Sequence, residues 1–132
     1  MKRIVLAAVA VCLILSGCAT TGQTPAQVSA NLITQVHKAC AVAQPTLASL
    51  QLMQSQLTAP QQADVAKAAT IVTEVCTSTV PAVPASVSEM VQTAFPLVLK
   101  LVDASPMSAQ DKTTAFVALT AAQIAVSAAL AQ

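Results

Sequence analysis

Few side chains in this sequence could carry out chemistry, and they are widely spaced. The chain has four Cys, one His and five Asp or Glu among 132 residues, and only 8% of the residues are charged. The single histidine, His37, lies beside Lys38 in the middle of a segment with helical periodicity. We therefore expect a partly exposed helical histidine rather than the base of a hydrolytic triad.

The carboxylates do not form a recognisable catalytic pair either. Asp64, Glu89 and Asp111 are expected in the first turns of helices, where a negative charge complements the helix dipole. With one His and no CxxC spacing, the sequence offers no metal site. It predicts a protein that is not an enzyme and that uses no metal or dissociable cofactor.

The overall composition excludes several classes of binding protein. A formal net charge of +1 provides no basic face for nucleic acid. The absence of Trp and Tyr removes the aromatic platforms on which glycan sites usually depend, and a hydrophobic content of 55% excludes intrinsic disorder.

The N-terminal segment has the pattern of an export signal. Lys2 and Arg3 precede an apolar run from Ile4 to Leu15, and small residues follow it. This run is too short to span a bilayer, which takes about 20 apolar residues. We expect residues 1–17 to be a secretory signal peptide.

The residues Leu15-Ser16-Gly17-Cys18 resemble the lipobox of bacterial lipoproteins. The resemblance covers about the first 20 residues; residues 19–132 carry no motif that resembles a known family. It implies cleavage between Gly17 and Cys18, a diacylglyceryl group on the Cys18 thiol, and acylation of the freed amine by a fatty acid such as palmitate. Cys12 is a poor competitor because bulky Val11 precedes it. The alternatives are an ordinary secretory signal and an uncleaved apolar anchor.

The lipoprotein resemblance also implies a location. Ala19 follows the lipidated Cys at the position where lipoproteins retained in the inner membrane typically carry Asp, which favours the outer membrane. Two or three acyl chains, at about 0.8 kcal/mol per buried CH₂, make a firm anchor. We expect the protein to face the periplasm rather than the cell surface, and to contact an envelope protein or a second copy of itself.

The two remaining cysteines form the only free pair in the mature chain. In an oxidising periplasm, Cys40 and Cys76 are expected to form a disulfide, the alternative being two buried reduced thiols. Closing a loop of about 37 residues should stabilise the fold by roughly 4 kcal/mol.

The distribution of glycine and proline in the mature chain predicts an all-α fold. No glycine follows Gly22, and glycine supplies the positive φ that tight hairpin turns require. Proline separates segments of helical period, and Thr24, Ser86 and Ser108 are expected to cap helices. We predict a small Ala-rich bundle of four to five helices with short Pro-punctuated loops. A tether at 18–24 leads into one domain at 25–132, with helices at about 25–43, 46–57, 60–79, 87–103 and 109–130.

Four further expectations concern these helices. Pro45 separates the first two helices, and Pro96 kinks the fourth. If the first three helices alternate in direction, the first and third run parallel and bring Cys40 and Cys76 to similar heights. The last helix is apolar almost all round, so we expect it at the centre of the bundle; the alternatives are membrane insertion and a flexible or oligomer-forming tail.

Together these features predict a non-enzymatic lipoprotein anchored in the outer membrane, acting as a small helical interaction or structural module. One alternative is a membrane-active or pore-associated protein that uses the apolar C-terminal helix. Another is a carrier of a small apolar ligand, which would need a cavity between the helices.

Overall fold

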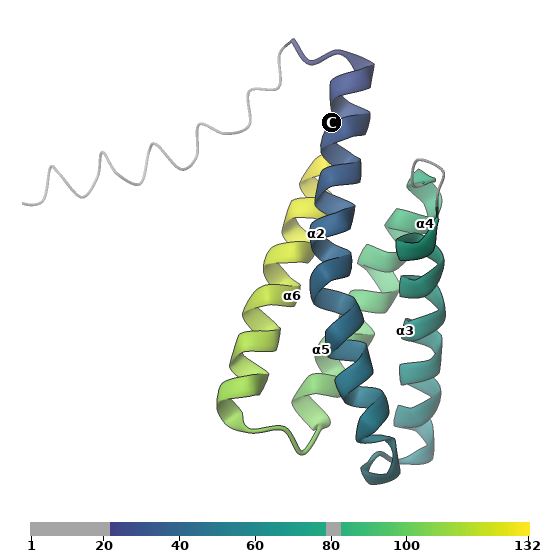
Figure 1. The fold of residues 1–132 in the computed structure, drawn as a ribbon, viewed down its shortest axis with the longest axis vertical. Helices are drawn as coiled ribbons and strands as arrows, with labels where there is room; N and C mark the ends of the chain where they lie inside the picture. Colours follow the sequence, from purple (N-terminus) through teal and green to yellow (C-terminus); the bar gives the residue numbers. More distant parts are fainter. Residues whose placement is uncertain (1–21, 79–82) are drawn as a thin grey trace, which may run out of the picture.

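Four helices run alongside one another in the computed structural model, each reversing the direction of the one before (Figure 1). The structure describes residues 22–78 and 83–132. Helix α2 (Pro25–Leu52) is followed by a 3₁₀ turn (Gln54–Gln56) and α3 (Ala59–Thr77). The third helix comprises α4 (Pro84–Glu89), a π segment (Met90–Ala94) and α5 (Phe95–Ala104), and α6 (Ala109–Leu130) is the fourth. No strand occurs in these two ranges, so the predicted all-α bundle is confirmed.

Side-chain caps begin two of the long helices as their sequences predict. Thr24 Oγ1 accepts a hydrogen bond from the Gln27 backbone N–H at 3.3 Å, and the Gln27 side chain accepts one from the Thr24 N–H at 2.8 Å. Ser108 Oγ accepts from the Asp111 N–H at 3.1 Å and donates to the Asp111 carboxylate at 2.6 Å. These contacts satisfy backbone donors that the first turn of a helix leaves without partners.

The predicted break at Pro45 is wrong, because α2 continues through it as one helix of 28 residues. A proline inside a helix costs about 3 kcal/mol relative to alanine. On either side of Pro45, the buried residues Ala43, Leu47 and Leu50 continue one apolar stripe into the core. Burying each leucine contributes roughly 1.5–3 kcal/mol, so packing outweighs the cost of the proline. The predicted helices 25–43 and 46–57 are therefore one helix as far as Leu52, and the end of the second prediction falls in the separate 3₁₀ turn Gln54–Gln56.

The third helix begins earlier than its predicted cap at Ser86. Pro84 occupies its first position, where the missing N–H of proline removes no helical hydrogen bond. The Ser86 hydroxyl instead donates to Glu74 on α3 at 3.5 Å. Just before Pro96, where the sequence predicts a kink, the helix contains the π segment, in which the Phe95 N–H donates to the Met90 carbonyl. The wider turn makes room for the proline ring, which would clash with the carbonyl four residues earlier in a regular helix.

The core is centred on the third helix rather than on the C-terminal one. Phe95, Val98 and Leu101 are fully or almost fully buried, and α5 packs against both α3 and α6. By contrast, α6 has three buried residues, Leu119, Val126 and Ala129. The expectation that residues 109–130 form the central helix is therefore wrong. Its sequence is apolar all round, but alanine buries little area, and the larger side chains of α5 fill the interior instead.

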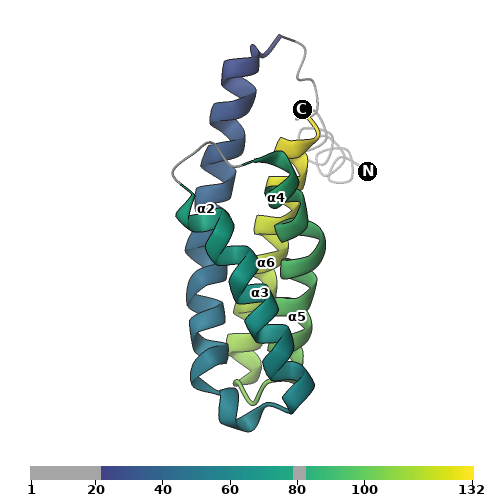
Figure 2. The same cartoon turned by 90° about the vertical axis from the view of Figure 1, so that its right-hand side faces the viewer.

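Both described ends of the chain lie at one end of the bundle. The Asn31 side chain donates a hydrogen bond to the Gln132 side chain at 3.1 Å, which joins α2 to the C-terminus. Beyond this contact the first turns of α2 extend past the other helices, as both ribbon views show (Figures 1 and 2). None of the residues from Pro25 to Gln35 is buried.

Candidate functional site

Cys40 and Cys76 form the predicted disulfide, which links the middle of α2 to the last turn of α3. Their Cα atoms lie 5.7 Å apart, within the usual range for a disulfide. The predicted arrangement, in which the cysteines lie on the first and third of three alternating helices, is wrong. Because α2 does not end at Pro45, α2 and α3 are consecutive antiparallel helices. The sulfurs meet because α3 returns along α2 after the turn at Gln54–Gln56. The disulfide is thus a structural bond within the helical hairpin.

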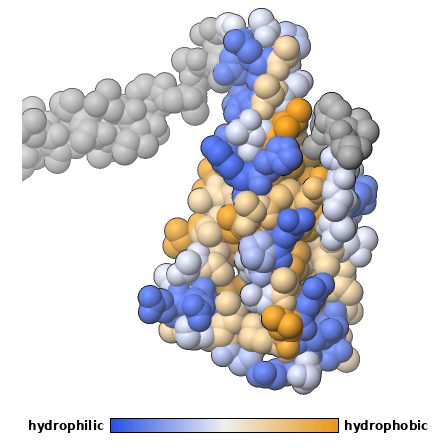
Figure 3. Space-filling model, viewed as in Figure 1, coloured by the Kyte–Doolittle hydropathy of each residue, from blue (hydrophilic) through white to orange (hydrophobic). Residues whose placement is uncertain are grey.

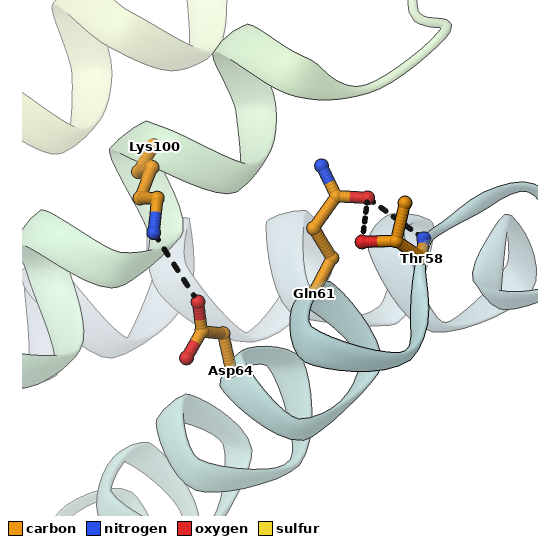
Figure 4. A network of polar contacts seen from close by, with 4 residues as sticks. All are labelled: Thr58, Gln61, Asp64 and Lys100. Carbon is orange, nitrogen blue, oxygen red and sulfur yellow. Dashed lines mark hydrogen bonds and ion pairs between the residues drawn. The ribbon is translucent and has the colours of Figure 1, made fainter.

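The titratable side chains are dispersed over the surface. His37 and Lys38 are exposed on α2. Asp64 on α3 pairs with Lys100 on α5 at 3.6 Å, beside the Thr58 and Gln61 capping pair (Figure 4). The Lys100 side chain is 73% exposed, and such surface pairs contribute little to stability.

The placement of two carboxylates differs from the sequence prediction. Asp111 lies in the first turn of α6, as expected. Asp64 and Glu89 do not occupy first turns, because α3 begins at Ala59 and the third helix at Pro84. Within the two described ranges, no group of three His, Cys, Asp or Glu side chains gathers as a metal site would require. The geometry of these residues brings no acid, base and nucleophile together.

A groove runs along the surface between α2 and α6, and we call it the α2–α6 groove. It consists of two open hollows of about 440 and 330 Å³ that share Val42 and Ala118. The 440 Å³ hollow lies toward the loop before α6 and includes Pro45 and Met107. The 330 Å³ hollow is lined on the α6 side by alanines alone: Ala118, Ala121, Ala122 and Ala125. In the same view as Figure 1, apolar surface predominates in the middle of this face and polar residues gather toward its ends (Figure 3).

A third hollow lies on α6 itself and adjoins this groove. It measures about 400 Å³, is lined by Phe116, Val117, Thr120, Ala121 and Ile124, and shares Ala121 with the groove. Val117 and Ile124 are 65% and 63% exposed. Both the Pro84–Ala104 and the Ala109–Leu130 helices are long and apolar enough to cross a membrane, a property that core helices of water-soluble proteins share.

Sequence reasoning named the cysteine pair but missed this apolar face. The apolar character of the last helix was interpreted as the sign of a central position, whereas Val117 and Ile124 on this helix are exposed. Their spacing of seven residues is visible in the sequence and is typical of a helix-packing stripe, but it does not indicate whether that stripe faces the interior or the surface. The lipobox residues Gly17 and Cys18 lie outside the described residues.

Comparison of the chain with models of protein families, with curated proteins and with solved structures finds no match.

Proposed function

We propose that this chain is a non-enzymatic lipoprotein of the bacterial outer membrane, anchored through lipid on Cys18. The lipobox-like residues Leu15-Ser16-Gly17-Cys18 carry the proposal, together with the basic and apolar residues before them. Cys18 precedes the helix cap at Thr24 by a short segment, so the anchor would connect almost directly to α2. The protein would face the periplasm.

The proposed role of the folded part is that of a helical interaction module. The exposed apolar face on α6 and along the α2–α6 groove supports this role, because large exposed apolar patches commonly mark contact sites. The scattered arrangement of His37 and the carboxylates favours binding over catalysis. The disulfide between Cys40 and Cys76 suits an oxidising compartment such as the periplasm.

Metabolic labelling with a fatty acid tests the anchor. The full chain is expressed in a bacterium in three forms: wild type, Cys18→Ser and Cys12→Ser. We expect label on the wild type and on Cys12→Ser, and none on Cys18→Ser, because only the Cys18 thiol follows the small residues that the processing enzymes require. The Cys12→Ser variant is the matched control, since it removes the other cysteine of the same segment. Label that persists on Cys18→Ser would refute the lipid anchor.

A second candidate function is a membrane-active protein that inserts α6. The observation that favours it is the length and apolar character of α6 combined with its small buried fraction. Alkaline extraction of membranes that contain Cys18→Ser distinguishes the two functions. Release into the soluble fraction supports lipid as the sole anchor. Retention supports insertion of α6 when mass spectrometry shows that residues 1–17 have been cleaved from the retained chain.

A further inference from the structure

The outer surface of α6 carries an apolar stripe with the spacing of a helix-packing seam. Val117, Ala121, Ile124, Ala128 and Ala131 are all exposed, and they follow one another at alternating steps of four and three residues. This is the 3.5-residue repeat with which two helices pack along their length. Within the described part of the chain, no other helix covers this stripe.

The stripe also contains the hollows that such packing requires. Knobs-into-holes packing places a side chain of one helix between four side chains of its neighbour. The 400 Å³ hollow is bounded by Val117, Thr120, Ala121 and Ile124, which stand at the positions of one such hole. The alanine-lined hollow of the α2–α6 groove lies beside it. Protruding side chains and hollows therefore occur on the same face.

We infer that a second copy of this chain covers this face, with the two α6 helices packed against each other around a two-fold axis. A two-fold interface uses the same patch on both partners, so the patch must be self-complementary. The side chains of Val117 and Ile124 of one copy would insert into the hollows beside Ala121 of the other copy. Residues 113–132 contain no charged side chain, so the side chains of two seams meet without like-charge repulsion.

The size of the face is adequate for a dimer when the groove is included. A helix of 22 residues is about 33 Å long, and two neighbouring helices together are about 20 Å wide. The projected area of the α2 and α6 face is therefore on the order of 650 Å², close to the roughly 800 Å² per partner of a stable interface. The α6 seam alone would supply about half of that area, so the partner must also contact the rim of α2, which includes Gln35 and Lys38.

The residue types favour a second copy over a lipid surface. Helices that lie on membranes present large apolar side chains flanked by many Lys or Arg residues. The α6 helix has one lysine, Lys112, at its start, and its stripe is mostly alanine. Alanine gains little from contact with lipid, but it allows two helix backbones to approach closely.

The relative direction of the two copies rests on the proposed lipid anchor. The contact between Asn31 and Gln132 places the start of α2 and the end of α6 at the same end of the bundle. Two chains anchored in one membrane therefore have parallel α6 helices. In that arrangement each residue of the seam faces its own copy, so Ile124 lies opposite Ile124 of the second chain.

Cysteine crosslinking of the full chain in cells tests both the contact and its direction. Ile124→Cys and Ala121→Cys are each expected to give a disulfide-linked dimer on mild oxidation. Ala66→Cys, at an exposed alanine on α3, controls for chance collision and for exchange with the native disulfide. We expect several-fold more dimer for the two seam variants than for Ala66→Cys. Equal amounts in all three would overturn the proposal.

A mixed experiment separates parallel from antiparallel packing. If Val117→Cys crosslinks to Ile124→Cys on a second chain while Ile124→Cys does not crosslink to itself, the parallel arrangement is wrong. Protection of Ile124→Cys from a membrane-impermeant thiol reagent without any dimer would overturn the second copy in favour of lipid. Dimer that persists when Cys18→Ser has lost its fatty-acid label would show that the seam holds without the anchor.

Charge substitution provides an independent measurement of the oligomeric state. Ile124→Glu places two carboxylates in the seam, and we expect the full chain in mild detergent to shift from dimer to monomer in sedimentation velocity. Leu52→Glu is the matched control, because Leu52 is 88% exposed at the end of α2, away from the seam. A monomeric wild type, or a dimer unaffected by Ile124→Glu, would contradict the proposal.

Discussion

Cys40 in the middle of α2 is bonded to Cys76 in the last turn of α3, and this bond ties together the two helices of the first hairpin. The bond spans a sequence separation of 36 residues. It therefore constrains the unfolded chain over about a third of the described sequence. Because the small side chains of this bundle bury little apolar area, we expect the disulfide to contribute a substantial part of the free energy of unfolding.

Removal of the disulfide should lower the free energy of unfolding by roughly 4 kcal/mol, the loop-closure value for this separation. We expect the double variant Cys40→Ala/Cys76→Ala to unfold at a clearly lower urea concentration than the wild type, as measured by circular dichroism. Wild type treated with a reductant is the control and should approach the double variant. An unchanged midpoint in both would contradict the structural role of the bond.

The two phenylalanines provide a matched test of where the core lies. Phe95 is fully buried, whereas Phe116 on α6 is half-buried and lines an open hollow. We expect Phe95→Ala to cost about 3–5 kcal/mol, because it leaves a cavity in the interior. Phe116→Ala should cost clearly less in a denaturant titration. Equal losses would place α6 in the core, against the structure.

The caps of α2 and α6 should differ in their effect on global stability. Ser108→Ala removes both hydrogen bonds to Asp111 at the start of a helix packed on the bundle, and should cost about 1 kcal/mol. Thr24→Ala removes the same kind of cap from a turn of α2 that contains no buried residue. We expect faster hydrogen exchange near Thr24 with little change in the unfolding midpoint. A global loss as large as that of Ser108→Ala would mean that the first turns of α2 are coupled to the core.

Replacement of Pro45 should stabilise the protein. Pro45→Ala restores a helical N–H inside α2, and the unfolding free energy should rise by up to about 3 kcal/mol. Pro60→Ala is the control, because Pro60 lies in the first turn of α3, where its ring is well accommodated. Thermal unfolding of both variants measures the difference. A destabilised Pro45→Ala would indicate that the proline ring is needed where it lines the α2–α6 groove.

The fold could be predicted from the sequence as far as local signals decide it. The Thr24 and Ser108 caps located the starts of α2 and α6, because each depends on side chains within the same turn. The continuity of α2 through Pro45 could not be predicted, because the burial of Leu47 and Leu50 against other helices outweighs the local cost of the proline. The sequence prediction also placed the wrong helix at the centre of the bundle. Which helix is central depends on the relative sizes of the side chains that the helices pack against one another.

In the candidate site, too, the residue pairing could be predicted from the sequence, whereas features that depend on packing between helices could not. The pairing of Cys40 with Cys76 was predicted by elimination, although the hairpin geometry that brings them together was not. The apolar face of α6 has a visible seven-residue signal in Val117 and Ile124. Sequence periodicity cannot distinguish a stripe that faces the interior from one that faces outward, because both satisfy the same repeat.

The first turns of α2 extend beyond the other helices, and their length would set the distance between the bundle and the membrane. Residues 25–30 continue the helix beyond the contact between Asn31 and Gln132, which adds about 9 Å of rigid rod. For a chain held through Cys18, this stretch of helix would act as a spacer between the membrane and the bundle. The apolar face of α6 would then lie away from the lipid headgroups. Insertion of whole turns into this spacer would raise the bundle without altering the packing below.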